Sequence, residues 1–182
     1  MPNRTMHPAL ACLLHLRPKS WPTVGLHMLA GGFMARGFGA LGPGALAPLL
    51  WGCFAWTVLL NGGTLALNSA VDRDDGDVGY LENPPTPPRG LGVFGFAFML
   101  AGLPIAWFTG LPFFLVYAVS VPMSWMYSAP PLRLKARGGW DVVINMIGYG
   151  GLTPLAGWLC VAAPPDRLDA LMHLASLAAT AL

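Results

Sequence analysis

The chain has 182 residues, of which 55% are hydrophobic and only 10% are charged, and its mean hydropathy is +0.58. Soluble domains carry about 25% charged residues, so this composition excludes an ordinary water-soluble protein. We expect an all-α protein with several membrane-spanning helices, because a backbone in lipid must satisfy its own hydrogen bonds. The small net charge of +2 indicates no nucleic-acid partner.

Residues 1–20 form a basic segment ahead of the first apolar stretch, and they include Arg4, Arg17 and Lys19. The short apolar run within them is followed by cations instead of a small-residue cleavage site, which excludes a secretory signal peptide. We expect this segment to lie at the membrane interface. The first predicted span follows from Trp21 to about Phe38, and its glycines offer small surfaces for close helix contact.

Four further apolar stretches have about the 20 residues that a helix needs to cross a bilayer. They are predicted at 46–67, 91–108, 111–127 and 141–161. A tight turn at Thr109 and Gly110 separates the third span from the fourth. The chain is therefore predicted to be a single integral-membrane domain over residues 1–182, a polytopic transmembrane helix bundle with five full spans.

A sixth apolar helix is expected to begin at Leu168, and it reaches the last residue, Leu182. About 15 residues are too few for a helix to cross a bilayer, and no interfacial anchor follows them. We therefore expect this chain to be the N-terminal part of a longer membrane domain.

Two polar loops are predicted between the spans, at residues 69–90 and 128–139. Cations gather in these loops and in the N-terminal segment, whereas the opposite ends of the spans carry only Arg36 and Arg167. By the positive-inside rule, the loops of such a multi-pass protein face the cytoplasm, as in a bacterial inner membrane. Both loops should then meet at one end of the bundle.

The first loop holds five of the chain's eight acidic residues. Four polar side chains, from the second span into this loop, share one stripe of a helix: Asn61, Asn68, Asp72 and Asp75. Gly76 is expected to end that helix, after which the loop can bring Asp77 back to the stripe. Oxygen ligands of this kind suit Mg²⁺. A solvated acidic loop that binds nothing explains the same cluster about equally well.

The second loop carries three cations at alternate positions after a Pro-Pro pair: Arg133, Lys135 and Arg137. Alternate side chains on an extended segment share a side, so all three are expected to face one anion. Phosphate oxygens are natural partners for guanidinium and ammonium groups. Positive-inside anchoring, or contact with lipid headgroups, would explain these cations as well.

Together the two loops resemble the UbiA family of intramembrane aromatic prenyltransferases. The segment Asn68–Asp77 is similar to the family's motif N-D-x-x-D-x-x-x-D, although Ser69 and Gly76 stand where the motif has aspartates. The family signature Y-S-x-P-P-x-R-x-K matches residues 127–135 without a gap. Residues 17–18 resemble the Arg-Pro pair that enters the first helix of the family.

The resemblance implies a UbiA-type bundle that transfers a prenyl group from an isoprenoid diphosphate to a lipophilic acceptor, with Mg²⁺ as cofactor and membrane lipid as surroundings. The catalytic residues it implies are Asp72, Lys135 and Tyr127. The diphosphate contacts are Arg17, Arg89, Ser128, Arg133, Lys135 and Asn145. The magnesium ligands are Asn68, Asp72, Asp75 and Asp77. Members of the family have nine helices and a second aspartate-rich motif after the sixth, which no residue after Asp169 supplies, so this piece alone is not expected to turn over.

Other polar and aromatic side chains in the spans have plainer explanations. Five aromatic residues are available to line a cavity: Trp56, Phe114, Trp125, Tyr127 and Tyr149. Helix packing and interfacial belts account for such residues several times more often. The lone His27 is expected to be a packing residue. Asp141 suits the dipole at the start of the fifth span, and Asn145, one turn further on, is expected to face the bundle interior.

Two other functions fit the same sequence. A transporter or channel component would attract a cation to the acidic loop without chemistry, and a non-catalytic UbiA-like protein would keep the fold for partner or lipid binding. The expected concentration of polar residues at one end of the bundle argues against a transport path, which needs polar groups through the membrane.

Overall fold

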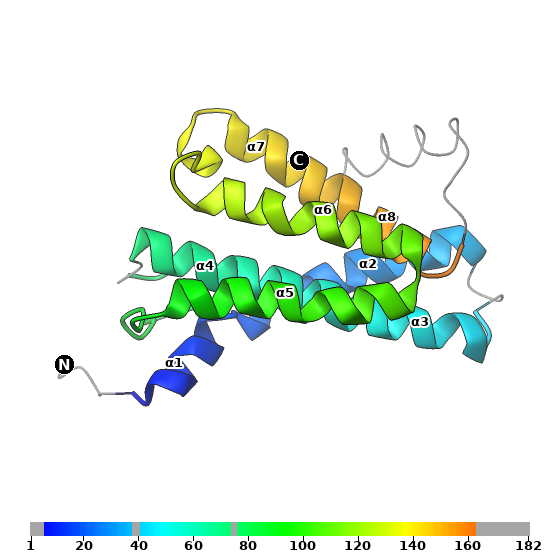
Figure 1. The fold of residues 1–182 in the computed structure, drawn as a ribbon, viewed down its shortest axis with the longest axis horizontal. Coiled ribbons are helices and arrows are strands. Elements are labelled where there is room, and N and C mark those ends of the chain that lie inside the picture. The colour runs from blue at the N-terminus through cyan, green and yellow to red at the C-terminus, as the bar shows by residue number, and fades with distance from the viewer. Residues whose placement is uncertain (1–5, 38–40, 74–75, 163–182) are drawn as a thin grey trace.

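The computed structural model describes residues 6–37, 41–73 and 76–162, and this part of the chain is built from helices. Four of its helices are long and apolar enough to cross a membrane: Pro43–Asp72, Leu91–Thr109, Leu111–Ser128 and Trp140–Leu159. They run along the long axis of the molecule (Figure 1). The prediction of an all-α membrane helix bundle is confirmed at this level, and the predicted sixth helix lies outside the described residues.

Two of the long helices change from α to π geometry midway and then return to α. The first consists of α3 (Pro43–Phe54), η2 (Ala55–Asn61) and α4 (Gly62–Asp72). The second consists of α7 (Trp140–Asn145), η4 (Met146–Leu152) and α8 (Thr153–Leu159). Short π-helical stretches are rare and occur frequently at functional sites, which directs attention to η2 and η4.

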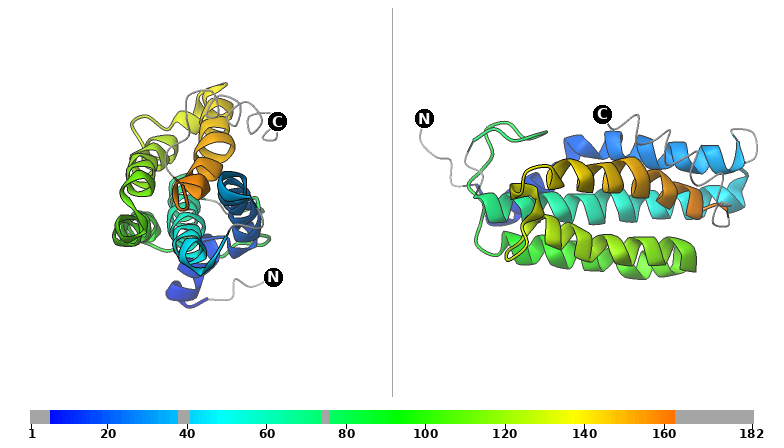
Figure 2. Two further views of the ribbon diagram at one scale, coloured as in Figure 1. Left: turned by 90° about the vertical axis from the view of Figure 1, so that its right-hand side faces the viewer. Right: turned by 90° about the horizontal axis from the view of Figure 1, so that it is seen from above.

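The helices α5 (Leu91–Thr109) and α6 (Leu111–Ser128) form a hairpin close to the predicted bounds. It is closed by Gly110, whose φ of 147° favours glycine. Seen end-on, this hairpin lies on one side of the bundle and α2 (Trp21–Arg36) lies on the other, with α3 and α8 between them (Figure 2).

The N-terminal segment folds against the bundle through α1 (Pro8–His15) and a single 3₁₀ turn, η1 (Pro18–Ser20). Leu16 and Arg17, between them, are buried, so this part of residues 1–20 packs against the bundle. The expected place of the segment at the membrane interface stays a prediction. The next helix, α2, has 16 residues and is shorter than the four candidate spans. The predicted first span therefore stays a prediction.

Glycines make the closest contacts between helices. A Cβ at Gly31 of α2 would overlap the carbonyl oxygen of Pro154, and a Cβ at Gly157 of α8 would overlap that of Met28. A Cβ at Gly63 of α4 would likewise overlap the carbonyl oxygen of Gly95 in α5. Small residues let backbones approach closely where lipid supplies no hydrophobic drive between helices. The predicted role of the glycines in the first apolar segment is confirmed at Gly31.

Substituting valine for Gly157 is expected to lower the unfolding midpoint of the detergent-solubilised protein sharply. Overpacking a core costs about 1–3 kcal/mol, and here the new side chain meets backbone that cannot rotate away. Gly44→Val is the matched control, because a Cβ at Gly44 has no atom within 4 Å. Equal midpoints for the two variants would contradict the assigned α2–α8 contact.

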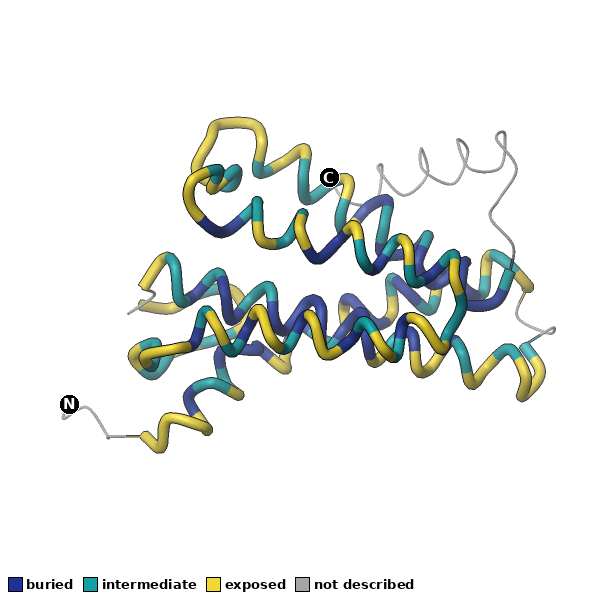
Figure 3. Tube along the Cα trace, in the orientation of Figure 1, coloured by how far each residue is buried: buried dark blue, intermediate teal, exposed yellow. Residues whose placement is uncertain are grey.

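Burial is concentrated along the inner faces of the helices (Figure 3). Met28, Met99, Phe113 and Tyr117 are fully buried, and the Tyr117 Oη donates a hydrogen bond of 2.9 Å to the carbonyl oxygen of Met99. Large apolar side chains such as Phe108 are instead exposed on the outer surface. An apolar exterior around a packed interior suits a protein whose solvent is lipid.

The loop after α4 and the loop after α6 lie at the same end of the bundle, as predicted (Figure 1). Their sequence-based bounds need correction. The helix α4 ends at Asp72, because Arg73 adopts a left-handed conformation with φ 54°, and it does not continue to Gly76. Ser69 and Ser128 therefore belong to helices, and the loops begin after Asp72 and Ser128.

Candidate functional site

Cations from the second loop meet the end of α4. The Asp72 Oδ1 accepts a hydrogen bond of 2.7 Å from the Arg133 Nη2, and its Oδ2 accepts one from the Lys135 Nζ. The Lys135 Nζ also donates to the Oδ1 of Asn68, one turn earlier on α4. We call these four residues the ionic cluster. All four were predicted site residues, and they come from segments more than 60 positions apart in the chain.

The route by which the cations converge differs from the expected one. The second loop is not extended, because Arg133 has a left-handed φ of 37° and Leu134–Ala136 forms a 3₁₀ turn, η3. Alternate side chains of this loop therefore do not share a side, as they would on an extended segment. The side chain of Arg137 is exposed and makes no hydrogen bond or ion pair with any described residue, so it does not join Arg133 and Lys135 at Asp72.

The ionic cluster is only partly shielded from solvent. The side chain of Arg133 is 46% exposed, that of Asp72 is 26% exposed and that of Lys135 is 11% exposed. Ion pairs at exposed positions contribute about 0–1 kcal/mol, so the Asp72–Arg133 pair adds little to stability. Asp72 and Arg133 can therefore exchange partners for a ligand without a large loss of fold stability, and Lys135 is the least exposed of the three charged side chains.

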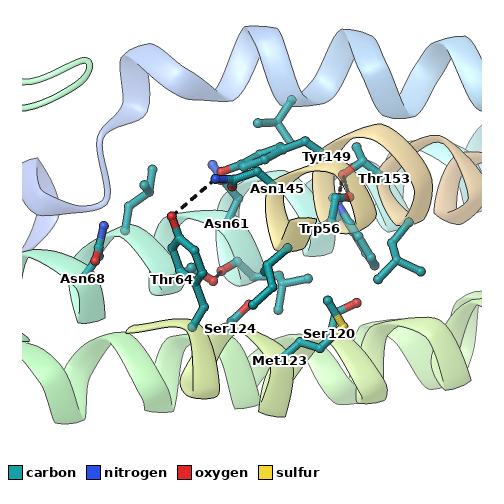
Figure 4. A pocket seen from close by; sticks show the side chains of 17 residues that line it. Trp56, Asn61, Thr64, Asn68, Ser120, Met123, Ser124, Asn145, Tyr149 and Thr153 are labelled. Atoms are coloured by element: carbon teal, nitrogen blue, oxygen red, sulfur yellow. Dashed lines mark hydrogen bonds between the residues drawn. The ribbon is translucent and has the colours of Figure 1, made fainter. Parts of the chain in front are cut away.

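A cavity of about 160 Å³ begins at the ionic cluster, because Asn68 lines it as well. It lies between α4, α6 and the helix formed by α7, η4 and α8, with Asn68 at one end and Trp56 and Thr153 toward the other (Figure 4). Much of its wall is apolar, as at Leu60 and Met123. Both π-helical segments line the cavity, and η2 contributes Trp56, Leu60 and Asn61.

Polar side chains continue into this cavity beyond Asn68. The Tyr149 Oη donates a hydrogen bond of 2.9 Å to the Oδ1 of Asn61. Deeper in the bundle, the Trp56 Nε1 donates one of 3.1 Å to the Thr153 Oγ1. These polar side chains lie beyond the end of the bundle at which polar residues were expected to be concentrated.

Three of the five candidate aromatic residues line the cavity, namely Trp56, Tyr127 and Tyr149, whereas Phe114 and Trp125 do not. The Oη of Tyr127 accepts a hydrogen bond of 3.4 Å from the Nδ2 of Asn145. Asn145 also lines the cavity, so its predicted inward position is confirmed.

Arg17 is held against α4 beside the ionic cluster. Its side chain is 6% exposed. Its Nη2 donates a hydrogen bond of 2.9 Å to the Ser69 Oγ, and its Nη1 donates one of 3.2 Å to the carbonyl oxygen of Gly79. Ser69 stands where the motif of the resembled family has an aspartate, and its hydroxyl is thus a buried partner of Arg17. These bonds join the N-terminal segment and the first loop to α4.

The other predicted site residues lie apart from the ionic cluster. The Asp77 Oδ1 accepts a hydrogen bond of 2.6 Å from the backbone N–H of Asn83, within the first loop. Arg89 is exposed just before α5. Ser128 is fully buried at the end of α6, and its Oγ has no hydrogen-bond partner among the described residues. Asp75 lies outside the part of the chain that the structure describes.

The donor set for a metal is small in the described part of the chain. No group of three or more His, Cys, Asp or Glu side chains gathers there in a way that could hold a metal ion. The amide oxygen of Asn68 and the carboxylate of Asp72 are of the type that Mg²⁺ prefers, and Mg²⁺ is often held by one or two carboxylates together with substrate phosphates. The two residues fit a magnesium site of that shared kind.

Several residues of the candidate site gave no signal in the sequence. Thr64, Ser120 and Thr153 line the cavity, yet each is a small polar residue in an apolar span, where hydrogen bonding to the preceding turn is the usual role. Thr64 and Ser120 do donate to carbonyl oxygens of Leu60 and Val116, four residues earlier. Only the fold shows that they also face a cavity.

Comparison with known proteins finds no match to this chain, either among protein-family models, among curated proteins or among solved structures. The ionic cluster and the cavity that adjoins it are therefore the features from which a function can be inferred.

Proposed function

We propose that this protein binds an isoprenoid diphosphate and transfers its prenyl group to a lipophilic acceptor, as the UbiA-type resemblance implies. One observation carries the proposal: Asn68 belongs both to a largely apolar cavity and to the ionic cluster. A ligand with an apolar tail and an anionic head matches this junction. The tail would lie along α4 and α6, and the head would lie against Lys135 and Arg133.

The cations of the cluster would bind the diphosphate by exchanging partners. In the free protein, Arg133 and Lys135 both donate to the carboxylate of Asp72. Phosphate oxygens offer the same acceptor chemistry with more charge. Asp72 and Asn68 would then be released to hold Mg²⁺, which when bound supplies further charge neutralisation at the phosphate oxygens. Arg17 and Arg89 stay predicted contacts.

The proposed chemical step breaks the allylic C–O bond, and the electron pair leaves with the diphosphate. Lys135 and Arg133 would stabilise the charge that grows on the departing oxygen. The allylic cation would lie among the aromatic faces of Trp56, Tyr127 and Tyr149. A bond then forms between its carbon and the acceptor, and the proton that the acceptor loses is taken up by the released diphosphate, so no further reactant is needed.

The test is equilibrium binding of radiolabelled farnesyl diphosphate to the full chain in detergent, with Mg²⁺ or with EDTA. Asp72→Asn is expected to weaken the magnesium-dependent binding by about tenfold or more, the equivalent of about 1.4 kcal/mol. Arg137→Met is the control, because Arg137 is an exposed cation outside the cluster. Absence of any magnesium-dependent binding would contradict the enzyme proposal, and unchanged binding by the Asp72 variant would contradict this site.

A cation transporter is the second candidate function, and it is favoured by the polar side chains that continue into the cavity at Asn61 and Thr153. Polar groups lining a path through the membrane are what conduction requires. Cation flux into liposomes that disappears with Asp72→Asn, in a protein that binds no diphosphate, would support transport over transfer.

A further inference from the structure

A second cavity, of about 460 Å³, adjoins the first on the side of α2. It is bounded by η1 and α2, by α7 and η4, and by Tyr80 of the first loop. The two cavities share four lining residues: Val24, Leu65, Asn145 and Tyr149. These four residues therefore form a common wall between two adjacent cavities.

Tyr149 is the central part of that wall. Figure 4 shows it over Asn61 at the edge of the first cavity. Its Oη donates to the Oδ1 of Asn61 at 2.9 Å, and the Nδ2 of Asn61 donates to the Oγ of Ser20 at 3.2 Å. Asn61 lines the first cavity and Ser20 lines the second, so this hydrogen-bonded chain runs from one cavity to the other and holds the ring in place.

The two cavities differ in charge. The first ends at Asn68, whose amide accepts a hydrogen bond from Lys135. The described residues that line the second include no lysine or arginine, whereas they do include the carboxylate of Asp141. An anionic head in the second cavity would meet a like charge with no lining cation to offset it. A second diphosphate is therefore disfavoured there.

The remaining polar groups of the second cavity suit a neutral hydroxyl. The carboxylate of Asp141 can accept a hydrogen bond, and Thr23 and His27 offer groups that can donate or accept. Val142 and Met146 supply apolar surface beside them. His27, expected from the sequence to be a packing residue, is half-buried and lines this space.

We propose that the second cavity is a binding site for a neutral, hydroxylated, lipophilic ring compound such as an alkylphenol. That this compound is the acceptor of the prenyl group rests on the proposed function, because it needs a prenyl donor in the first cavity as its reaction partner. Tyr149 then separates the two ligands, and its rotation away from Asn61 would join the two spaces.

The experiment uses two photoactivatable probes that differ only in the head group. One is a neutral alkylphenol, and the other is the corresponding alkylbenzoic acid, which carries an ionised carboxylate. Each is added to the full chain in detergent without any diphosphate, and the labelled peptides are identified by mass spectrometry. The phenol is expected to label residues 20–27 and 141–149, and to exceed the benzoate there by about tenfold, because one like charge in a partly buried site is worth on the order of 1.4 kcal/mol.

Two variants make the assignment specific. Thr23→Phe fills the cavity from an exposed position on α2 and should remove most of the phenol labelling, whereas Val93→Phe, on the exposed face of α5, should leave it unchanged. Asp141→Asn should raise benzoate labelling toward that of the phenol. Phenol labelling that survives Thr23→Phe, or a phenol-to-benzoate ratio that Asp141→Asn does not change, would overturn the second site.

Failure of this inference is separable from failure of the proposed function. Labelling that is lost with Thr23→Phe in a protein that binds no diphosphate keeps the second site and removes its role as an acceptor site. Magnesium-dependent diphosphate binding, in a protein whose phenol labelling is spread over the lipid-facing surface, overturns the second site and leaves the proposed function standing.

Discussion

Replacing Lys135 with methionine is expected to weaken binding of an isoprenoid diphosphate by about a hundredfold. Lys135 donates to both Asn68 and Asp72 and is the least exposed cation of the ionic cluster. A hydrogen bond to a charged group is worth about 1.5–3 kcal/mol, so the loss of one or two such bonds to phosphate accounts for that factor. The measurement is equilibrium binding of labelled farnesyl diphosphate in the presence of Mg²⁺.

Two further variants separate binding from folding in this prediction. Arg137→Met removes an exposed cation of the same loop whose side chain makes no hydrogen bond or ion pair with a described residue, and it should leave binding within error of the wild type. Lys135→Arg keeps the charge but replaces a compact ammonium with a planar fork, so we expect an intermediate affinity. Because Asp72 retains Arg133 as a partner, the unfolding midpoint of Lys135→Met should change little. Binding within threefold of the wild type would refute the assigned role of Lys135.

Replacing Arg17 with methionine is expected to cause the largest loss of stability among single changes at the loop end of the bundle. The guanidinium is buried and donates to the Ser69 hydroxyl and to the carbonyl oxygen of Gly79. Loss of two hydrogen bonds from a charged group, one of them to the buried Ser69 hydroxyl, corresponds to about 3 kcal/mol or more. The unfolding midpoint should fall, and the N-terminal segment should become sensitive to limited proteolysis.

Lys19 provides a matched control for that variant, because it is a cation two residues away. Its Nζ lies 3.8 Å from the Glu82 Oε1, and both side chains are largely exposed, so Lys19→Met should leave the midpoint unchanged. The unfolding midpoint of Ser69→Ala should lie between those of the two variants, since this change removes one of the hydrogen bonds of Arg17. A protein in which Arg17→Met and Lys19→Met unfold at the same temperature would contradict the structural role given to Arg17.

The features that the sequence predicted well are those set by composition and length. The spans at 91–108 and 111–127 lie close to the observed α5 and α6, because a bilayer fixes the length of an apolar helix. The two polar loops lie at the same end of the bundle because two membrane-spanning helices, α5 and α6, separate them along the chain. The pairing of Arg133 and Lys135 with Asp72 follows from opposite charges brought to one end of the bundle.

The features that the sequence predicted poorly depend on local backbone geometry. Gly76 was the natural helix terminator, yet Arg73 ends α4 in a left-handed conformation that arginine seldom adopts. The turn at Leu134–Ala136 follows a pair of prolines that fits an extended segment equally well. The burial of Arg17 requires a partner at Ser69, more than 50 positions away, and no local pattern encodes such a pairing.

The two π-helical segments have a consequence for how this protein tolerates insertions and deletions. A π-helical stretch behaves like an α-helix that has taken up on the order of one additional residue. Deleting one residue within 55–61 would return η2 to α geometry without turning α3 relative to α4, because the π turn absorbs a residue that would otherwise rotate the helix by about 100°. The side chains within η2 would change their facing toward the cavity, among them Trp56 opposite Thr153, while Asn68 and Asp72 would stay beside Lys135. The far end of the cavity can therefore be reshaped by a change in chain length alone, without any substitution in the ionic cluster.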